Sequence, residues 1–331
     1  MGKRGVGLVK PSTRAFVREA LKLRSQSAHQ PEARKYSLLD FLHGYFYGRW
    51  IYLYIGIGLG EHPLAKKYGG LIKKLGNGWA GLKRRLPGSK VGSVHKKLPG
   101  VSETYHGKVV PLEAARQLVM VNEPVDLPNL EHIIPYPRAR DIILRNPDHI
   151  AVLDCPCRSA RQNPCLPLDV CLVIGEPFAS FVVEHNPQKA RRITPQEAVD
   201  ILKAEDARGH VHHAFFKDAM LNRFYAICNC CSCCCGAMQA QRNGSPMLAS
   251  SGYVARVDEA QCLGCGDCES VCQFEAIAVP MGTAQVDEAA CMGCGVCVEH
   301  CPNGALSLLR DLSRGEPLEI CQLMAAQSFN L

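Results

Sequence analysis

The apolar and polar positions divide the chain into three regions, which we expect to form separate units at 1–110, 111–249 and 250–331. The first region is rich in glycine, basic and aromatic residues, and its stretch 36–60 is the most apolar of the chain. A short helix is predicted over 16–23. From 60 to 100, lysine pairs separated by glycine and proline indicate an irregular, largely exposed segment.

The second region has the pattern of an ordinary globular domain. Apolar periodicity and turn residues predict helices at 112–121, 137–145 and 195–208. Short apolar runs predict strands at 150–153, 170–174 and 178–183. The third helix has the clearest signals, because Thr194 is suited to cap its first turn and Pro195 to begin it. The alternation of strands and helices suggests a small α/β unit within a protein of the α+β class.

Residues 236–250 have the composition of a linker, and an internal repeat follows them. Residues 258–279 match residues 287–308 at a constant offset of 29 positions. The two copies share four cysteines, a preceding Asp-Glu-Ala and a following alanine. A duplicated unit of this size implies pseudo-two-fold symmetry, so we expect a C-terminal domain of two similar halves.

The cysteines are placed as metal ligands rather than as a disulfide framework. There are 19, none lies before Cys155, and most occur in tight groups. A disulfide framework would spread its cysteines over a small secreted domain. The N-terminus is basic and lacks the apolar core of a signal peptide, so we expect a reducing, cytoplasmic location.

Each half of the repeat carries the spacing C-x2-C-x2-C-x3-C, which suits an iron–sulfur cubane. Three thiolates come from one tight loop, and the fourth must come from elsewhere because the loop cannot wrap the far corner of the cluster. Glycines in the loops, such as Gly264 and Gly293, let the backbone approach the cluster without a Cβ in the way. Zinc ribbons, the alternative, use two C-x2-C pairs separated by a longer loop.

Residues 250–309 resemble the bacterial-type dicluster ferredoxins, through the two cysteine motifs and Pro302 after the last cysteine. The first half departs from the motif, with Gln273 in place of the proline. The resemblance implies two [4Fe-4S] clusters, low-potential transfer of single electrons, and exchange of the fourth ligand between the halves. The implied ligands of cluster A are Cys262, Cys265, Cys268 and Cys301, and those of cluster B are Cys272, Cys291, Cys294 and Cys297.

Ten further cysteines lie upstream, and thiolates packed so closely require a cation to offset their repulsion. One sequence set is Cys155, Cys157, Cys165 and Cys171, and the other is Cys228, Cys230, Cys231, Cys233, Cys234 and Cys235. We expect one or two further iron–sulfur clusters here, with zinc or a dithiol, disulfide or persulfide site as the alternatives. His210, His212 and His213 lie near the second set, as ligands, proton shuttles or hydrogen-bonded structural residues.

Two further resemblances concern this part of the chain. Cys234, Cys235 and Gly236 are similar to the CCG motif of heterodisulfide reductase-type subunits, but the partner cysteines of that motif are not matched at their set distances. Residues 110–331 resemble largely uncharacterised multi-cluster ferredoxin-like proteins of anaerobic bacteria and archaea. Neither resemblance implies a particular substrate.

The N-terminal region differs in charge from the rest of the chain. Residues 1–110 hold 21 Lys and Arg against 5 Asp and Glu, a net charge of +16, while the remainder carries −9. Its aromatic and lysine-rich segments suit an anionic membrane surface, or else a buried segment packed on the middle domain or on a partner subunit. The apolar run is too short to span a membrane. We expect such contacts through residues 36–97, and we expect no nucleic-acid binding because no nucleic-acid fold is evident.

These patterns predict an iron–sulfur electron-transfer protein that relays single low-potential electrons between a donor and a redox enzyme. The acidic C-terminal domain predicts a redox partner with a basic docking face. One alternative is an iron–sulfur oxidoreductase with a catalytic thiol or cluster site at Cys228–Cys235, and another is a sensor of redox state or metal. The sequence leaves open whether the chain is an enzyme or an electron carrier.

Overall fold

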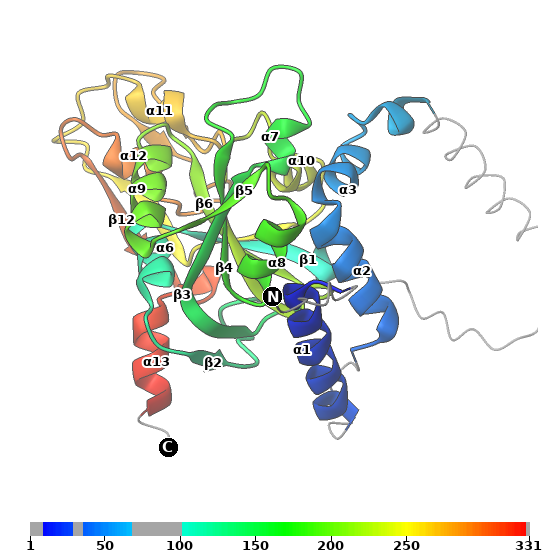
Figure 1. The fold of residues 1–331 in the computed structure, drawn as a ribbon. Helices are drawn as coiled ribbons and strands as arrows, with labels where there is room; N and C mark the ends of the chain where they lie inside the picture. Colours follow the sequence, from blue (N-terminus) through cyan, green and yellow to red (C-terminus); the bar gives the residue numbers. More distant parts are fainter. Residues whose placement is uncertain (1–8, 29–35, 68–100, 329–331) are drawn as a thin grey trace, which may run out of the picture.

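The computed structural model describes residues 9–28, 36–67 and 101–328 and shows a mixed α+β protein. A central sheet of eight strands has helices on both faces, and the C-terminal domain lies at one side of it, away from the N-terminal helices (Figure 1). The predicted α+β class is therefore confirmed. The segment 60–100, predicted to be irregular, lies mostly outside the described residues.

The sheet is mainly antiparallel, although strands and helices alternate along the chain. Its strands are β1 (Tyr105–Val110), β2 (Val125–Leu127), β3 (Ile142–Asp154), β4 (Asp169–Glu176), β5 (Ala190–Ile193), β6 (Val211–Lys217), β7 (Arg223–Cys230) and β8 (Leu248–Ala249). They lie in the order β2-β3-β4-β7-β6-β1-β8, and β5 pairs with β3. All of these pairs are antiparallel except β1 with β8. The alternation therefore does not produce the parallel sheet typical of α/β proteins.

Side chains alternate across the sheet and build one apolar core on each face. In β4, Cys171 and Val173 belong to one core, and Leu172 and Ile174 belong to the other. The first core also contains Cys155 and other upstream cysteines, whereas the second core, as far as the structure describes it, contains none. The middle-domain thiols that belong to a core, among them Cys155 and Cys171, therefore lie on one face of the sheet.

The helices on the cysteine face are α1 (Pro11–Ala28), α2 (Leu38–Arg49), α3 (Ile51–Gly58) and α8 (Phe178–His185). Phe16 of α1 contacts the rings of Phe178 and Phe181, with centroid distances of 6.0 and 5.4 Å. The hydroxyl groups of Tyr47 in α2 and Tyr225 in β7 form a hydrogen bond of 2.8 Å. Part of the aromatic N-terminal segment is therefore buried against the middle domain, where it covers the thiols.

The helices on the opposite face are α6 (Leu112–Met120), α9 (Pro195–Asp206) and α13 (Ile320–Ser328). The predicted helices at 112–121 and 195–208 are thus confirmed. The hydroxyl of Thr194 caps α9 as predicted, because it accepts a hydrogen bond of 3.1 Å from the backbone N–H of Glu197. The predicted helix at 16–23 and the strands at 150–153 and 170–174 are found within α1, β3 and β4.

Three local predictions are wrong. The helix predicted at 137–145 is a bend followed by the start of β3, where Ile142 and Leu144 are buried at alternate positions opposite β2. The strand predicted at 178–183 is α8, whose buried Phe178, Phe181 and Val182 recur at helical spacing. The linker predicted at 236–250 forms α10 (Gly236–Arg242) and β8, which pairs with β1.

The C-terminal domain contains two short sheets and two short helices. In its sheets, β9 (Tyr253–Val257) pairs with β12 (Leu306–Arg310), and β10 (Ile277–Ala278) pairs with β11 (Gln285–Val286). Its helices are α11 (Asp267–Val271) and α12 (Val296–Glu299). They follow Gly266 and Gly295, whose left-handed φ values are 85° and 87°. The two copies of the repeat therefore fold alike around their cysteine loops.

The remaining elements are short. They are α5 (Val101–Thr104), α7 (Pro156–Ser159) and a 3-10 turn (Leu312–Arg314). Within residues 9–28, 36–67 and 101–328, every helix is too short or too polar to cross a membrane.

Gly44 of α2 lies against the backbone of Ala219, which gives a test of how the N-terminal helices pack. A Cβ at Gly44 would lie 2.0 Å from the carbonyl oxygen of Ala219, whereas a Cβ at Gly58 meets nothing within 4 Å. We expect Gly44→Ala to lower the free energy of unfolding by about 1–3 kcal/mol, because the helix must move off the sheet. The control Gly58→Ala should leave the thermal midpoint unchanged or raise it. An equal loss of stability in the two variants would contradict this packing.

Candidate metal centres

The eight C-terminal cysteines surround two small cavities of about 20 Å³ each. The first cavity is lined by Cys262, Cys265, Cys268 and Cys301, and the second by Cys272, Cys291, Cys294 and Cys297. Each set takes three cysteines from one half of the domain and the fourth from the other half. This is the grouping that the ferredoxin resemblance implies for clusters A and B.

Two glycines allow the cysteine loops to approach neighbouring backbone. Gly264 and Gly293 have left-handed φ values of 65° and 64°. A Cβ at Gly264 would lie 2.2 Å from the carbonyl oxygen of Gly282, and one at Gly293 would lie 2.1 Å from that of Tyr253. A larger residue at either position would therefore push the loop away from its cavity.

Backbone N–H groups point at four of the cysteine sulfurs. The N–H groups of Ala276 and Ala305 donate to Cys272 and Cys301 at 3.3 and 3.2 Å, at equivalent positions of the two halves. Cys262 and Cys291 also accept a backbone hydrogen bond each, at 3.4 and 3.5 Å. Hydrogen bonds to sulfur stabilise a thiolate and tune the potential of a bound cluster.

The donor set in the C-terminal domain fits two iron–sulfur clusters. Burial, together with the nearby Cys272 and Cys291, raises the pKa of Cys297 to about 12. The thiolate therefore forms only when a bound cation replaces the proton. When bound, [4Fe-4S] clusters supply one-electron redox chemistry, while the chain holds them by four thiolates each and donates hydrogen bonds to the sulfurs.

The ten upstream cysteines gather at the ends of three neighbouring strands. Cys155 follows β3, Cys171 lies in β4, and Cys228 lies in β7. Because Leu172 pairs with Ile227 in antiparallel register, Cys171 lies opposite Cys228. The turn after β7 supplies most of the others. The pairing of these strands thus brings thiols from distant parts of the chain together.

The two upstream sequence sets do not correspond to two groups in space. Cys165, from the first set, lies beside Cys233, from the second, although 68 positions separate them. The structure forms a group of four, Cys165, Cys231, Cys233 and Cys234. The other six, Cys155, Cys157, Cys171, Cys228, Cys230 and Cys235, form a second group around one cavity, which Cys231 and Cys234 of the first group also border.

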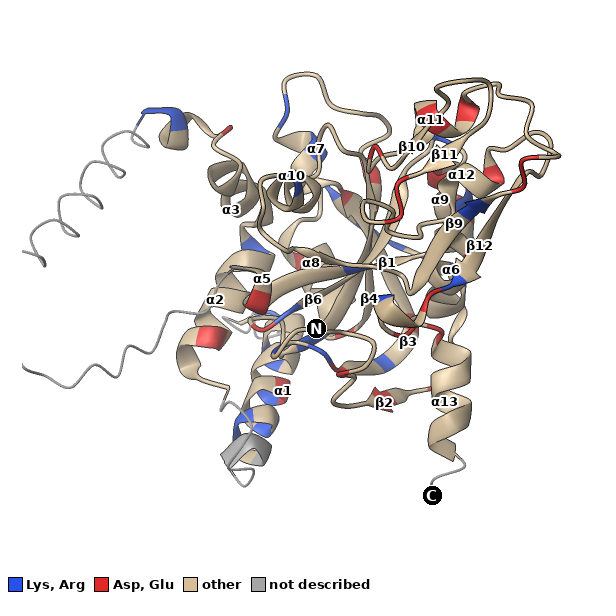
Figure 2. Cartoon of the chain, turned by 180° about the vertical axis from the view of Figure 1, so that it is seen from behind, with Lys and Arg blue, Asp and Glu red and all other residues tan. Residues whose placement is uncertain are grey.

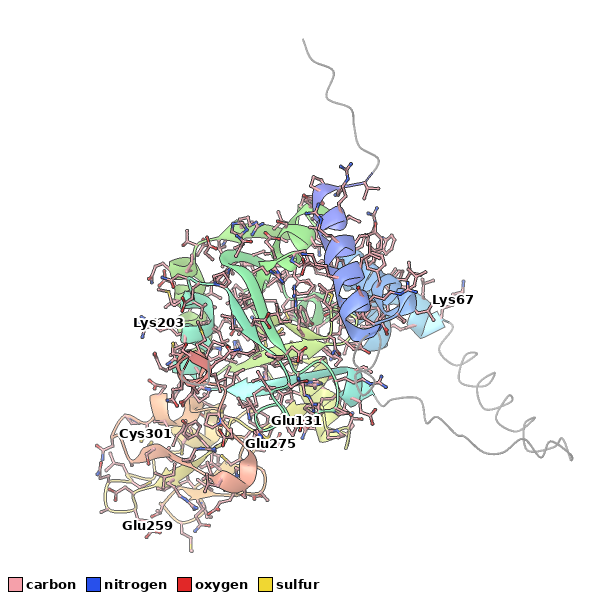
Figure 3. The ribbon with its side chains drawn as sticks, turned by 90° about the horizontal axis from the view of Figure 1, so that it is seen from below. Lys67, Glu131, Lys203, Glu259, Glu275 and Cys301 are labelled. Carbon is pink, nitrogen blue, oxygen red and sulfur yellow. The ribbon has the colours of Figure 1, made fainter. Side chains whose placement is uncertain are left out.

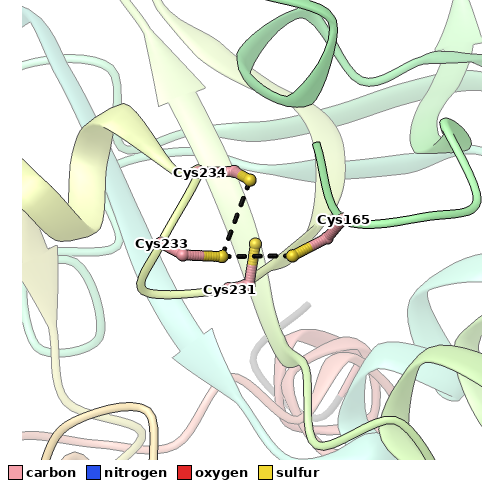
Figure 4. A group of neighbouring side chains, drawn as sticks. All are labelled: Cys165, Cys231, Cys233 and Cys234. Carbon is pink, nitrogen blue, oxygen red and sulfur yellow. Dashed lines mark hydrogen bonds between the residues drawn. The ribbon is translucent and has the colours of Figure 1, made fainter. Parts of the chain in front are cut away.

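The four-cysteine group is compact (Figure 4). Its sulfurs all lie within 4.8 Å of one another, and Cys233 lies 3.1 Å from Cys165 and 3.6 Å from Cys234. A tetrahedral site with metal–sulfur bonds of about 2.3 Å holds its sulfurs about 3.8 Å apart. The ligands of a cubane bind four different irons and are more widely spread. The spacing in this group therefore suits a single metal ion.

The six-cysteine group lines one larger cavity on the same face of the sheet. The cavity has a volume of about 300 Å³, and its wall includes Tyr47, Tyr105 and Tyr225. Residues of α3 also line it, so an N-terminal helix covers part of this cavity. The buried wall is mostly aromatic and aliphatic apart from the thiols.

Arg158 lies between the two upstream groups and is only 1% exposed. Its guanidinium donates to the Glu205 carboxylate at 2.5 Å and to the carbonyl oxygens of Pro167 and Asn229 at 2.5 and 3.1 Å. These bonds tie the loop before β4 to the end of β7. Sequence reasoning missed this role, for which the only signal was a basic residue directly after Cys157.

The nearby histidines are mainly structural. His210 Nδ1 lies 2.7 Å from the Glu205 carboxylate, and His212 Nδ1 lies 2.6 Å from the Asn229 side-chain oxygen. Burial lowers the pKa of His213 to about 3, so this side chain is neutral at physiological pH. The geometry of His210 and His212 is that of hydrogen-bonded structural residues.

Gln273 connects the C-terminal domain to the four-cysteine group. Its side-chain oxygen accepts a hydrogen bond of 2.8 Å from the backbone N–H of Ser232. Ser232 lies between two cysteines of the group, and Gln273 directly follows Cys272 of the second cavity. Pro302, at the corresponding position of the second half, has no side chain that could accept this bond. The departure from the ferredoxin motif therefore joins two candidate metal centres, and no sequence pattern predicted this contact.

Comparison with known proteins identifies the C-terminal domain. Residues 255–308 match the family described as 4Fe-4S dicluster domain, which implies two 4Fe-4S clusters. No curated protein matches the chain. The family match covers the C-terminal domain, so the upstream sites are interpreted from their own geometry.

Substitutions at Gly293 and Gly304 distinguish two effects of an added Cβ: a clash that opens the loop around the second cavity, and strain in the backbone. Both have left-handed φ values, 64° and 63°, but a Cβ at Gly304 meets nothing within 4 Å. The counterpart of Gly304 in the first half is Glu275, which adopts φ 55° with a side chain. We expect Gly293→Ala to lose up to about four iron atoms per chain, because the loop cannot close on one cubane.

The control Gly304→Ala should keep the full iron content. Both variants are measured by iron and sulfide assay after anaerobic purification. Equal iron loss in the two variants would show that backbone strain, and not the contact with Tyr253, controls cluster binding.

Proposed function

Starting from the 4Fe-4S dicluster domain at residues 255–308, we propose that this protein transfers single electrons from an external partner to metal centres in its middle domain. The observation that carries the proposal is the place of the second ferredoxin cavity. It lies against the middle domain, whereas the loop of the first cavity faces solvent. The protein would thus relay low-potential electrons inward.

The loop around the first cavity supports its role as the point of electron entry. Leu263 is 71% exposed, and Cys265 is also exposed. A partner can therefore approach the proposed cluster A closely, and electron transfer between proteins depends on such close approach.

The second cavity supports the inward step. Cys294, one of the proposed ligands of cluster B, packs in a small apolar cluster with Val109 of β1 and Val211 of β6. The bond between Gln273 and Ser232 links the same side of the domain to the four-cysteine group. These two contacts hold the loop of the proposed cluster B directly against the middle domain.

At the end of this path, we propose that the four-cysteine group binds one metal ion through thiolates. Its close spacing supports a single ion over the further cubane that the sequence predicted. Burial, followed by the contact with Cys233, raises the pKa of Cys165 to about 11. Ion binding must therefore displace protons and weaken at low pH. Iron here would extend the electron path, whereas zinc would only fix the loop.

Acidic residues around the first cavity support docking by a partner with a basic face. Asp258, Glu259, Asp267 and Glu269 are exposed there. Figure 2 shows acidic positions gathered over α11 and the neighbouring loops, and Figure 3 shows Glu259 on the far side of the molecule from Lys67. Complementary charge at this site would speed encounter with the partner.

A second candidate function is that of an iron–sulfur oxidoreductase with its site at Cys228–Cys235. The cavity of about 300 Å³ beside these thiols supports it, because this volume is at the lower end of that of small-molecule sites. In this case the ferredoxin domain would feed electrons to a reaction at the cavity wall. The arrangement of the two domains is the same for both candidate functions.

The N-terminal helices offer a separate docking surface. Apolar side chains of α2, of α3 and of the residue between them are exposed to solvent: Leu38, Leu39, Leu42, Phe46, Trp50 and Ile57. Within a region of net charge +16, such a surface suits an anionic membrane, and attachment to a partner subunit is the alternative. Only part of the predicted contact region 36–97 lies within the described residues.

Charge reversal at Glu259 tests the proposed entry site. The reductants are reduced methyl viologen, a cation, and dithionite, whose active form is an anion. We expect Glu259→Lys to slow reduction by the cation about two- to fivefold at low salt and to speed reduction by the anion, with both effects lost at high salt. Stopped-flow absorbance measures both rates. Glu123→Lys, on an exposed loop of the middle domain, is the matched control and should change neither rate.

Equal slowing with both reductants would point to structural damage at the loop. Unchanged rates of reduction of Glu259→Lys by both reductants would contradict electron entry at this face.

Leu39→Glu tests the N-terminal surface. Leu39 is 76% exposed on α2, and Met281, at 87%, is an equally exposed apolar residue on the C-terminal domain. We expect the wild-type protein and Met281→Glu to sediment with vesicles that contain anionic lipid, and Leu39→Glu to bind at least about threefold more weakly. Absence of wild-type binding would exclude the membrane and leave the partner subunit.

A further inference from the structure

The six thiols of the second group form a ring. All six line the same cavity, and the thiols interact electrostatically as neighbours in the order Cys228, Cys171, Cys155, Cys157, Cys235 and Cys230. The two ends of this series, Cys228 and Cys230, are two positions apart in β7 and so point to the same side of the sheet. Among the described residues, no three of these six sulfurs lie as close together as those of the four-cysteine group. The six thiols therefore surround a space and do not converge on one point.

The cavity beside the ring is far larger than the space for one cubane in the same structure, and Cys231 and Cys234 border it as well. It measures about 300 Å³, whereas the two cavities of the dicluster domain measure about 20 Å³ each by the same criterion. Those two cavities provide an internal reference, since each has the four thiols that a cubane requires. The ring of six thiols thus has more ligands and more room than one [4Fe-4S] cluster uses.

Charge limits what the ring can hold. Among the described residues that line the cavity, the only charged side chain is Arg158, which is already paired with Glu205 at 2.5 Å. Six thiolates would place six negative charges in an apolar wall, at a high cost in free energy without cations. Metal ions are the cations that bind thiolates directly and exclude water.

We infer that these six thiols hold one iron–sulfur cluster larger than a single cubane. A cubane has four irons and accepts four terminal thiolates, so it would leave two of the six thiols without metal. A larger cluster uses all six ligands and fills the extra volume. That this cluster receives electrons from the dicluster domain rests on the proposed function. The assignment of its six ligands does not.

The N-terminal helices act as the lid of this site. Leu59, at the end of α3, lies over the turn that holds the thiols: a Cβ at Gly236 would be 2.7 Å from Leu59 Cδ2 and 4.0 Å from Cys157 Sγ. Ile51 and Ile55 of the same helix also line the cavity. This apolar cover would limit the access of water and oxygen to the cluster, and it accounts for the packing of an aromatic segment against the face of the sheet that carries these thiols.

The test is the iron and sulfide content of the full-length protein, purified without oxygen, together with its Mössbauer spectrum. We expect about 14 or more iron atoms per chain, since the dicluster domain accounts for eight of them. The spectrum should contain iron that differs from that of the dicluster domain. A content of about 12, or 13 with one iron in the four-cysteine group, would indicate a single cubane in the ring. A content of about eight or nine would indicate none, and either result would overturn the inference.

Six single Cys→Ser variants, one at each ring position, provide the second measurement. Each should lower the iron content or change the Mössbauer spectrum, because all six thiols are ligands. Cys321→Ser is the matched control, since Cys321 is exposed in α13 and lies outside the ring. If two of the six variants changed neither the iron content nor the Mössbauer spectrum, the ring would hold a cubane with two spare thiols, which would contradict the larger cluster.

The EPR signal of the reduced dicluster domain separates this inference from the proposed function. The ring variants that fold should retain that signal. Loss of the signal in the wild-type protein would refute the proposed electron transfer without changing the iron assigned to the ring. Six titratable free thiols in addition to Cys321, with an intact dicluster signal, would refute the ring cluster alone.

Discussion

Repulsion between closely packed thiolates is the constraint on which this structure depends. The fold gathers ten cysteines near the ends of three neighbouring strands and eight more in the attached domain, and Arg158 is the one charged side chain among the described residues that line the upstream cavity. Burial favours the protonated thiol, so metal binding at the proposed sites must displace these protons. The described core on the opposite face of the sheet contains no cysteine and has purely structural packing.

The contacts between the domains give this chemistry a direction. One ferredoxin cavity faces solvent within an acidic surface, and the other packs against β1 and β6. Gln273 then joins the dicluster domain to the turn between Cys231 and Cys233. Under the proposed function, each of these features shortens or fixes the path of an electron from the surface to the upstream cysteines. The N-terminal helices complete the arrangement, because they cover the deepest thiols.

Local signals in the sequence were sufficient for the features that depend on neighbouring residues. The spacing of the C-terminal cysteines predicted two metal-binding loops, and the cap at Thr194 predicted α9. The division of the upstream cysteines could not be predicted, because Cys165 meets Cys233 only through the pairing of β4 with β7. Likewise, α8 has the β-branched and aromatic residues of a strand, and its helical form is set by packing under α1 and α2.

The central claim is that electrons pass from the dicluster domain into the middle domain. Rapid-freeze EPR after mixing the oxidised protein with less than one equivalent of a fast reductant tests it most directly. The account predicts that the signal of reduced cubanes forms first and then declines, while a signal or absorbance change from the middle domain grows at the same rate. A cubane signal that persists at full intensity, with no change in the middle domain, would contradict the account.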